Sequence, residues 1–195
     1  MTNLLYICRE NRDRSPVAKQ ITEYKLGDEY NYHNVYVDSA GIDPYSFPGL
    51  SLEMNHALLQ LGYNTKLHTP KIVTSGLLGL QDIVLCMKKS HVKKVLKLTP
   101  ELEDRVYTLS GYAGSDEDVP SPGELIKETY IFPILKFMPY KVRELVYNAY
   151  GYTDKEDRKG VIGVYIRIIK QIERYVDKAI ERMREEGIIS LHKTN

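Results

Sequence analysis

Residues 4–16 read LLYICRENRDRSP, and this stretch decides the fold. Its first four residues are apolar and run directly into Cys8, as a short strand buried on both faces would. Five residues separate Cys8 from Arg14, and Ser15 and Pro16 favour the start of a helix. A loop of this length can wrap one tetrahedral oxyanion, with backbone N–H groups and the guanidinium directed at the anion and the sulfur beneath it. The stretch therefore predicts phosphate chemistry on a thiolate.

Length and charge restrict the class of protein. A chain of 195 residues is long enough for one domain with a hydrophobic core and too short for two domains of typical size. Lys and Arg number 27 against 26 Asp and Glu, and no basic stripe stands out, so we expect no nucleic-acid partner. The longest apolar runs, such as 131–135, are too short to span a bilayer, so we expect no membrane partner.

Cysteine usage indicates the compartment. Cys8 and Cys86 are the two cysteines of the chain, and each stands at a predicted strand end. This number does not suggest a disulfide framework, and residues 1–8 lack the pattern of a secretory signal. The sequence therefore predicts a cytoplasmic protein. We expect no metal and no cofactor.

Strand and helix signals alternate along the chain. The predicted strands are residues 4–8, 35–39, 82–87 and 105–109, and the predicted helices are residues 16–26, 51–61 and 88–98. Ser15 is the predicted N-cap of the first helix, with Pro16 at its first position. A long closing helix is predicted from one apolar face, made of Ile169, Ile172, Val176, Ala179, Ile180 and Met183.

This alternation defines the expected architecture. Strands that alternate with helices imply one α/β domain of three layers, with a central four-stranded parallel sheet and helices on both faces. The phosphate-binding loop follows the first strand, at the carboxyl edge of the sheet where ligands bind.

Residues 123–160 interrupt the alternation. The segment contains two of the three phenylalanines and two prolines, and it ends in the polar run 153–160, which we interpret as a turn. We interpret the whole segment as a helical insertion in a single domain that covers residues 1–195. A lid over the site, a contact in a homodimer and a helical hairpin that completes the core remain open alternatives.

The loop brings together a thiol, an arginine and a hydroxyl. Only a thiolate attacks, and a helix N-terminus with a nearby arginine favours the anionic form of Cys8. Arg14 can hold two phosphate oxygens in a bidentate fork, and Ser15 is placed to donate its hydroxyl to the sulfur. The chemistry implied is a two-step displacement, in which a phosphocysteine forms and water then removes the phosphate. A structural cysteine followed by a charged loop is the competing interpretation.

These residues resemble the low-molecular-weight protein tyrosine phosphatase family. That family opens with an apolar strand into Cys-x-Gly-Asn-x-Cys-Arg-Ser-Pro, and residues 8–16 read CRENRDRSP. The segment 38–41, DSAG, resembles the family's Ser-Ala-Gly after the second strand. Gly62 and His68 resemble its spaced glycine and histidine, and residues 82–87 are similar to its third strand.

The resemblance implies a role for each loop residue. Cys8 would be the nucleophile, Arg14 the phosphate clamp and Ser15 the residue that assists the thiolate. Asn11 would brace the loop through His68. Phosphate would be bound by the loop residues Arg9, Glu10, Asn11, Arg12, Asp13 and Arg14.

Two aromatic residues fall where the family presents a wall to its substrate. These are Tyr45 and Phe47, in the loop after the second strand. Packing of both rings on the core is the alternative.

The expected general acid is missing. Ser121 stands where the family has the aspartate of an Asp-Pro pair, and a hydroxyl does not supply a proton at neutral pH. Loss of a positioned acid costs about 10²–10⁴-fold in rate. Asp118 could take over this role if the loop is shaped differently; the alternative is that residues 116–118 form a solvated acidic turn.

Three charged residues also depart from the family pattern. Glu10 replaces a loop glycine and Asp13 the second cysteine, so attraction for phosphate requires both carboxylates to face outward. Lys88 follows Met87 where the family usually has an acidic residue. It either adds a positive charge near the site or merely starts a helix.

Three functions follow from these observations. The first is phosphomonoester hydrolysis through phospho-Cys8, with aryl phosphates such as phosphotyrosine favoured because phenolate leaves readily. The alternative is a catalytically weakened protein that binds phosphate or a phosphopeptide. Arsenate reduction is less favoured, because the thioredoxin-coupled version needs three cysteines and this chain has two.

Overall fold

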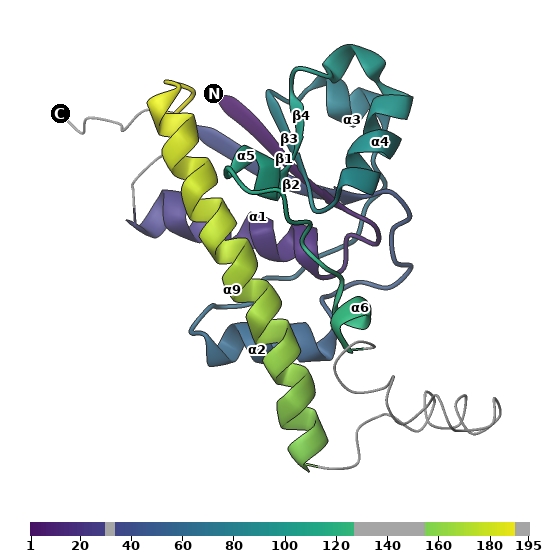
Figure 1. Cartoon of the computed structure of the whole chain (residues 1–195), viewed down its shortest axis with the longest axis vertical. Coiled ribbons are helices and arrows are strands. Elements are labelled where there is room, and N and C mark those ends of the chain that lie inside the picture. Colours follow the sequence, from purple (N-terminus) through teal and green to yellow (C-terminus); the bar gives the residue numbers. More distant parts are fainter. Residues whose placement is uncertain (30–33, 127–154, 190–195) are drawn as a thin grey trace.

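A four-stranded parallel sheet forms the centre of the protein in the computed structural model, which describes residues 1–29, 34–126 and 155–189 (Figure 1). The strands are β1 (Thr2–Cys8), β2 (Val35–Gly41), β3 (Ile83–Cys86) and β4 (Val106–Thr108). Their order in the sheet is β2-β1-β3-β4, and every pair is parallel. All four predicted strands are confirmed, and their ends differ from the predicted ones by at most two residues.

The helices connect these strands and follow the last of them. They are α1 (Arg14–Tyr24), α2 (Leu52–Gln60), α3 (Ser75–Gly79), α4 (Lys89–Leu98), α5 (Leu109–Tyr112), α6 (Pro122–Ile126) and α9 (Lys155–Glu185). A π-helical turn, Lys25–Glu29, extends α1, and a 3₁₀ turn covers Pro100–Leu102. The short helices α3 and α5 were outside the prediction, because one turn of helix is too short to show an apolar period. Helix α6 lies within the predicted helical insertion except for Pro122.

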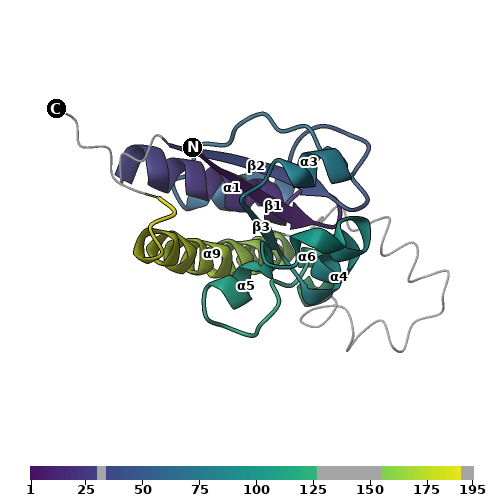
Figure 2. The ribbon, with the colours of Figure 1, turned by 90° about the horizontal axis from the view of Figure 1, so that it is seen from above.

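Helices cover both faces of the sheet, so the three-layer prediction is confirmed (Figure 2). On one face α1, α2, α5 and α9 enclose the larger core, which includes Leu4, Tyr6 and Cys8. On the other face α3 and α4 cover Leu5, Ile7 and Cys86. The alternation of side chains along β1 explains the division, because successive residues of a strand point to opposite faces.

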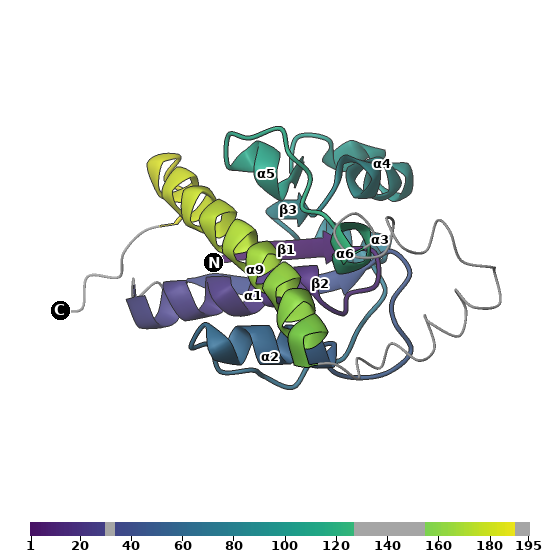
Figure 3. The ribbon, with the colours of Figure 1, turned by 60° about the horizontal axis from the view of Figure 1, so that its bottom comes forward.

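The closing helix α9 is the longest helix that the structure describes and runs across α1 and α2 (Figure 3). The six apolar residues predicted to form its inner face, Ile169, Ile172, Val176, Ala179, Ile180 and Met183, are all buried. The helix begins at Lys155, so the turn expected at 153–160 is wrong from residue 155 onward. The rest of the predicted insertion is α6 and residues 127–154, and the latter lie outside the described residues.

The start of α1 differs from the prediction. The helix begins at Arg14 and Asp13 is its N-cap, so Ser15 and Pro16 lie inside the first turn. The Ser15 hydroxyl lies 3.1 Å from the Cys8 sulfur and bonds to it, which takes the place of a capping bond. By contrast Ser51 is the N-cap of α2, as the predicted helix start implied, and its hydroxyl accepts from the Met54 N–H.

Candidate active site

The loop between β1 and α1 folds back over the sulfur of Cys8. Asn11 takes a left-handed backbone conformation, with φ of 50°, and its N–H donates to the Cys8 sulfur at 3.2 Å. The loop passes so close to β2 that a Cβ on Gly41 would stand 2.8 Å from the Arg9 carbonyl oxygen. A glycine at the end of β2 therefore allows the loop to close, because any other residue would push it outward.

Two donors point at the buried thiol. Cys8 is only 2% exposed, and it accepts from the Asn11 N–H and from the Ser15 hydroxyl. Hydrogen bonds to sulfur and the N-terminus of α1 both stabilise a thiolate. The thiol of Cys8, the predicted nucleophile, therefore lies beneath the loop with two hydrogen-bond donors directed at its sulfur.

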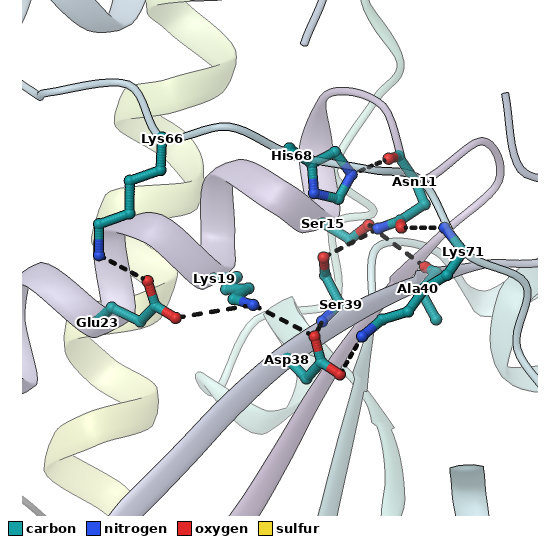
Figure 4. A network of polar contacts seen from close by, with 10 residues as sticks. All are labelled: Asn11, Ser15, Lys19, Glu23, Asp38, Ser39, Ala40, Lys66, His68 and Lys71. Atoms are coloured by element: carbon teal, nitrogen blue, oxygen red, sulfur yellow. Dashed lines mark hydrogen bonds and ion pairs between the residues drawn. The ribbon is translucent and has the colours of Figure 1, made fainter. Parts of the chain in front are cut away.

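Asn11 is the centre of the polar network that holds the loop (Figure 4). Its side-chain amide donates to the hydroxyls of Ser15 and Ser39, each at 3.0 Å, and its side-chain oxygen accepts from the Lys71 N–H at 2.9 Å. The His68 Nε2 lies 2.5 Å from the Asn11 carbonyl oxygen. Since a carbonyl only accepts, Nε2 carries the proton. The predicted contact between Asn11 and His68 is therefore present.

Asp38 extends this network on β2, and sequence reasoning missed it. The carboxylate is buried and accepts from the Ser39 N–H at 2.8 Å, from Lys19 at 3.3 Å and from Lys71. Burial acts to raise the pKa of Asp38, but these donors outweigh it and hold the pKa below its usual value. The sequence signal for Asp38 was its place in the segment 38–41. Nothing in the sequence indicated that its carboxylate contacts Lys71.

Replacing Asn11 with alanine should lower both stability and turnover. The change removes three side-chain hydrogen bonds in a buried site and places alanine at a positive φ, so we expect a loss of about 1–3 kcal/mol in the free energy of unfolding. Denaturant unfolding measures it. Asn55→Ala on α2 is the matched control and should be neutral, because alanine favours a helix. An Asn11→Ala protein as stable as the wild type would contradict this role of the network.

A cavity of about 480 Å³ opens above the loop. One wall is the loop itself, and the other comes from the start of α4, from α6 and from α9. The lining residues are Cys8, Arg9, Glu10, Arg12, Asp13, Arg14, Lys88, Ser90, His91, Lys94, Ser121, Pro122, Gly123, Glu124 and Tyr165. Five cationic side chains thus face three carboxylates, which favours an anionic ligand.

One of the two loop carboxylates is turned away from the anion site. The carboxylate of Asp13 accepts from the N–H of Ser51 at 3.0 Å and from its hydroxyl at 2.7 Å, so it faces α2. Burial raises the pKa of Asp13, and the bonds from Ser51 oppose this rise. Glu10 is exposed. The outward orientation that phosphate binding requires is therefore met for Asp13.

Arg14 is held in place by the backbone of Val119. Its guanidinium is buried and donates through Nη1 to the Val119 carbonyl oxygen at 3.0 Å. The remaining N–H groups of a guanidinium stay available for a second acceptor, and a phosphate presents two oxygens at the matching spacing.

Tyr45 and Phe47 lie outside the core. Their ring centroids are 5.8 Å apart, and Phe47 is 66% exposed, so the alternative of packing on the core is wrong. The Arg12 guanidinium stacks 4.1 Å above the Tyr45 ring. This contact connects the aromatic pair to a residue of the phosphate-binding loop.

The structure does not bring Asp118 to the cavity. Its Oδ1 accepts from the Lys89 N–H at 2.9 Å, at the first turn of α4, and it is absent from the lining residues. Ser121 does line the cavity, together with Glu124 and Lys88. Lys88 immediately precedes α4 and also contributes a positive charge to the site. Both roles considered for this lysine are therefore present.

His91 was not foreseen as a site residue. It follows Lys88 by three residues and lines the cavity from α4. Burial, and after it the charge of Arg14, lowers the pKa of His91 to about 4. The imidazole is therefore neutral at pH 7. Within the described ranges, no three His, Cys, Asp or Glu side chains group so as to hold a metal ion.

A parallel α/β sheet with a cysteine and an arginine around one anion-sized loop defines a phosphatase of the thiolate type. The family model for low molecular weight phosphotyrosine protein phosphatases matches residues 3–146, and this chain belongs to that family. It is a cysteine-dependent phosphatase. The matched residues extend beyond 122 into the segment predicted as an insertion.

Individual proteins agree with this assignment. The protein-tyrosine-phosphatase Wzb of Escherichia coli K12 is 26% identical over 134 residues, which cover 66% of this chain and 82% of Wzb. Arsenate reductase 1 of Staphylococcus epidermidis is 24% identical over 84 residues, 43% of this chain and 58% of the reductase, and is thus the weaker likeness.

Solved structures show the same fold. The phosphotyrosine phosphatase VcLMWPTP-2 of Vibrio cholerae has a TM-score of 0.71 at 19% identity, over 96% of this chain and 99% of that one. The YwlE arginine phosphatase of Geobacillus stearothermophilus has a TM-score of 0.69 at 20% identity, over 96% of each chain. Among the residues that our structure describes, no helix is long and apolar enough to cross a membrane.

Proposed function

We propose that this phosphatase hydrolyses phosphotyrosine and other aryl phosphates, with Cys8 as the nucleophile and Arg14 as the phosphate clamp. The observation that carries the proposal is the Cys8 sulfur, which accepts two hydrogen bonds at the floor of a cavity lined by five cationic side chains. Residues 9–14 would bind the phosphate oxygens through backbone N–H groups and the guanidinium.

In the first step the Cys8 thiolate attacks phosphorus. The S–P bond forms, the P–O bond to the phenol breaks, and the electron pair goes to the leaving oxygen. Arg14 is anchored on Val119 and offers its free N–H groups to the two phosphate oxygens that gain charge. Such preorganised donors stabilise the transition state more than the ground state.

In the second step water attacks the phosphocysteine and the thiolate leaves. Ser15 supports this step, because its hydroxyl at 3.1 Å stabilises negative charge on the departing sulfur. Asn11 and His68 act as positioning residues that keep the Ser15 hydroxyl and the loop backbone in place. Phosphate then leaves the cavity.

The leaving group decides the substrate class. Asp118 bonds to the start of α4 and Ser121 carries no acidic proton, so an ester that leaves as a stable anion is favoured. Phenolate meets this condition better than the alkoxide of serine. The exposed pair Tyr45 and Phe47 lies beside the loop and offers an aromatic surface for a phenyl ring.

A set of phosphopeptides with identical flanks tests the substrate class. We expect kcat/KM for a phosphotyrosyl peptide to exceed that for a phosphoseryl peptide by about 10²-fold or more. This factor is the rate enhancement that one positioned general acid provides. A phosphoarginyl peptide belongs in the same set. Equal rates for phosphotyrosine and phosphoserine would contradict the proposal, and tight vanadate binding without turnover would favour the alternative of a phosphate-binding protein.

The organisation of the chain remains part of the proposal. We propose one domain over residues 1–195, in which the predicted insertion ends where α9 begins at Lys155. A homodimer contact through this insertion stays a prediction that sedimentation equilibrium tests. The cytoplasmic location also stays a prediction.

A further inference from the structure

The wall of the cavity that faces the loop carries a fixed ammonium group. Lys88, just before α4, reaches into the cavity with a side chain that is 19% exposed. Its Nζ lies 2.6 Å from Oε1 and 2.5 Å from Oε2 of Glu124. Glu124 belongs to α6, which lies beside the carboxyl end of β1 in Figure 3. The lysine is therefore held across the site rather than free in solvent.

Glu124 is itself fixed from the other side. Its Oε2 accepts from the Ser121 N–H at 2.8 Å, and its own N–H donates to the Ser121 hydroxyl. Partial burial acts to raise the pKa of Glu124, but the bonds from Lys88 and Ser121 outweigh it and lower the pKa to about 2. The carboxylate is ionised at pH 7 and serves as an anchor. An ammonium has three N–H groups, and two suffice for the carboxylate oxygens, which leaves the third for a ligand.

Four other titratable groups in or near the cavity are less suited to give a proton. His91 is neutral at pH 7, because burial and the charge of Arg14 lower its pKa to about 4. Asp13 faces Ser51, and Glu10 is exposed to solvent at the rim. Asp118 is bonded to the backbone of α4.

We propose that the Lys88 ammonium donates a proton to the leaving-group oxygen of the substrate. This inference rests on the proposed function. As the thiolate of Cys8 bonds to phosphorus and the P–O bond breaks, the proton moves from Nζ to the phenolic oxygen and leaves a neutral amine. In the second step the amine accepts a proton from the attacking water, the S–P bond breaks, and the ammonium and the thiolate are both restored.

The basicity of the leaving oxygen decides how much a proton donor contributes. An ammonium carries protons that it can give to an oxygen that gains negative charge as the P–O bond breaks. General acid catalysis contributes more as the leaving group becomes more basic. In the first step Lys88 should therefore be important for phenyl phosphate and nearly dispensable for p-nitrophenyl phosphate, whose phenolate leaves without a proton.

Two esters and three variants test the inference in the full chain. Lys88→Met removes the proton and the charge, whereas Lys88→Arg keeps a charge that is not released as a proton. We expect both variants to lose about 10²-fold or more in kcat/KM on phenyl phosphate and less than about tenfold in kcat/KM on p-nitrophenyl phosphate. The comparison uses kcat/KM because this parameter reports the first step, whereas both esters share the second step. The matched control is Lys89→Met, whose side chain pairs with Asp116 at the surface and should stay within about twofold of wild type on both esters.

Several results would overturn the inference. These are equal losses of kcat/KM on the two esters in Lys88→Met, wild-type kcat/KM for phenyl phosphate in Lys88→Arg, and no loss in either variant. Vanadate binding and thermal unfolding of each variant show that the site is folded. If the wild type hydrolyses both esters through Cys8 and Lys88→Met does the same, only this inference fails. If the wild type hydrolyses neither ester, the proposed function fails with it.

Discussion

Replacing Cys8 with serine should reduce p-nitrophenyl phosphate turnover by about 10⁴-fold or more, the scale seen when a covalent nucleophile is removed. The sulfur is the atom on which the Asn11 N–H and the Ser15 hydroxyl converge. A serine hydroxyl in its place stays protonated at neutral pH and attacks poorly. Steady-state kinetics with the purified protein measure the loss.

The other cysteine provides the matched control. Cys86 ends the neighbouring strand β3, but its side chain lies in the core on the opposite face of the sheet. Desolvation by burial strongly raises the pKa of the Cys86 thiol, so it stays protonated. Cys86→Ala should therefore keep wild-type turnover. Activity that survives Cys8→Ser, or that is lost in Cys86→Ala with the fold intact, would contradict the mechanism.

Replacing Arg14 with lysine should lower kcat/KM by about 10²–10³-fold, although the charge is kept. The guanidinium donates to the Val119 carbonyl oxygen and still has N–H groups for two phosphate oxygens. A lysine ammonium cannot do both, because it is a point charge without the planar fork. Calorimetric titration with vanadate and kinetics on an aryl phosphate should show parallel losses.

Arg105 supplies the control for this substitution. It lies at the start of β4, is solvent-exposed and is no part of the cavity. Arg105→Lys should leave binding and turnover unchanged. If Arg14→Lys also binds vanadate like the wild type, charge alone holds the phosphate and the bidentate clamp is wrong.

The sheet could be predicted because its strands carry their own signal. Each is a short apolar run bounded by polar residues or turns, and buried parallel strands show this pattern in the sequence. The apolar face of α9 repeats with a helical period, so it too was visible. The start of α1 could not be predicted correctly, because a serine can equally well cap a helix or donate a hydrogen bond to a sulfur atom. Only the proximity of Cys8 in the fold gives Ser15 the second role.

The supports of the site were harder to foresee, because they join residues distant in sequence. Asn11 meets the Lys71 backbone and Lys88 meets Glu124, pairs separated by 60 and 36 residues. Sequence patterns within one loop contain no information on such pairs. The same limit explains why the position of Asp118 could not be predicted. The polar run that contains it is compatible with a general acid or with a solvated turn, whereas its carboxylate accepts a hydrogen bond from the first turn of α4.

Trapping the phosphoenzyme tests the central claim most directly. Wild-type protein is mixed with excess p-nitrophenyl phosphate and denatured rapidly, and its peptides are examined by mass spectrometry. We expect one phosphoryl group on the peptide that contains Cys8, formed together with a burst of p-nitrophenol. A phosphoryl group on any other residue, or turnover without a covalent intermediate on Cys8, would contradict it.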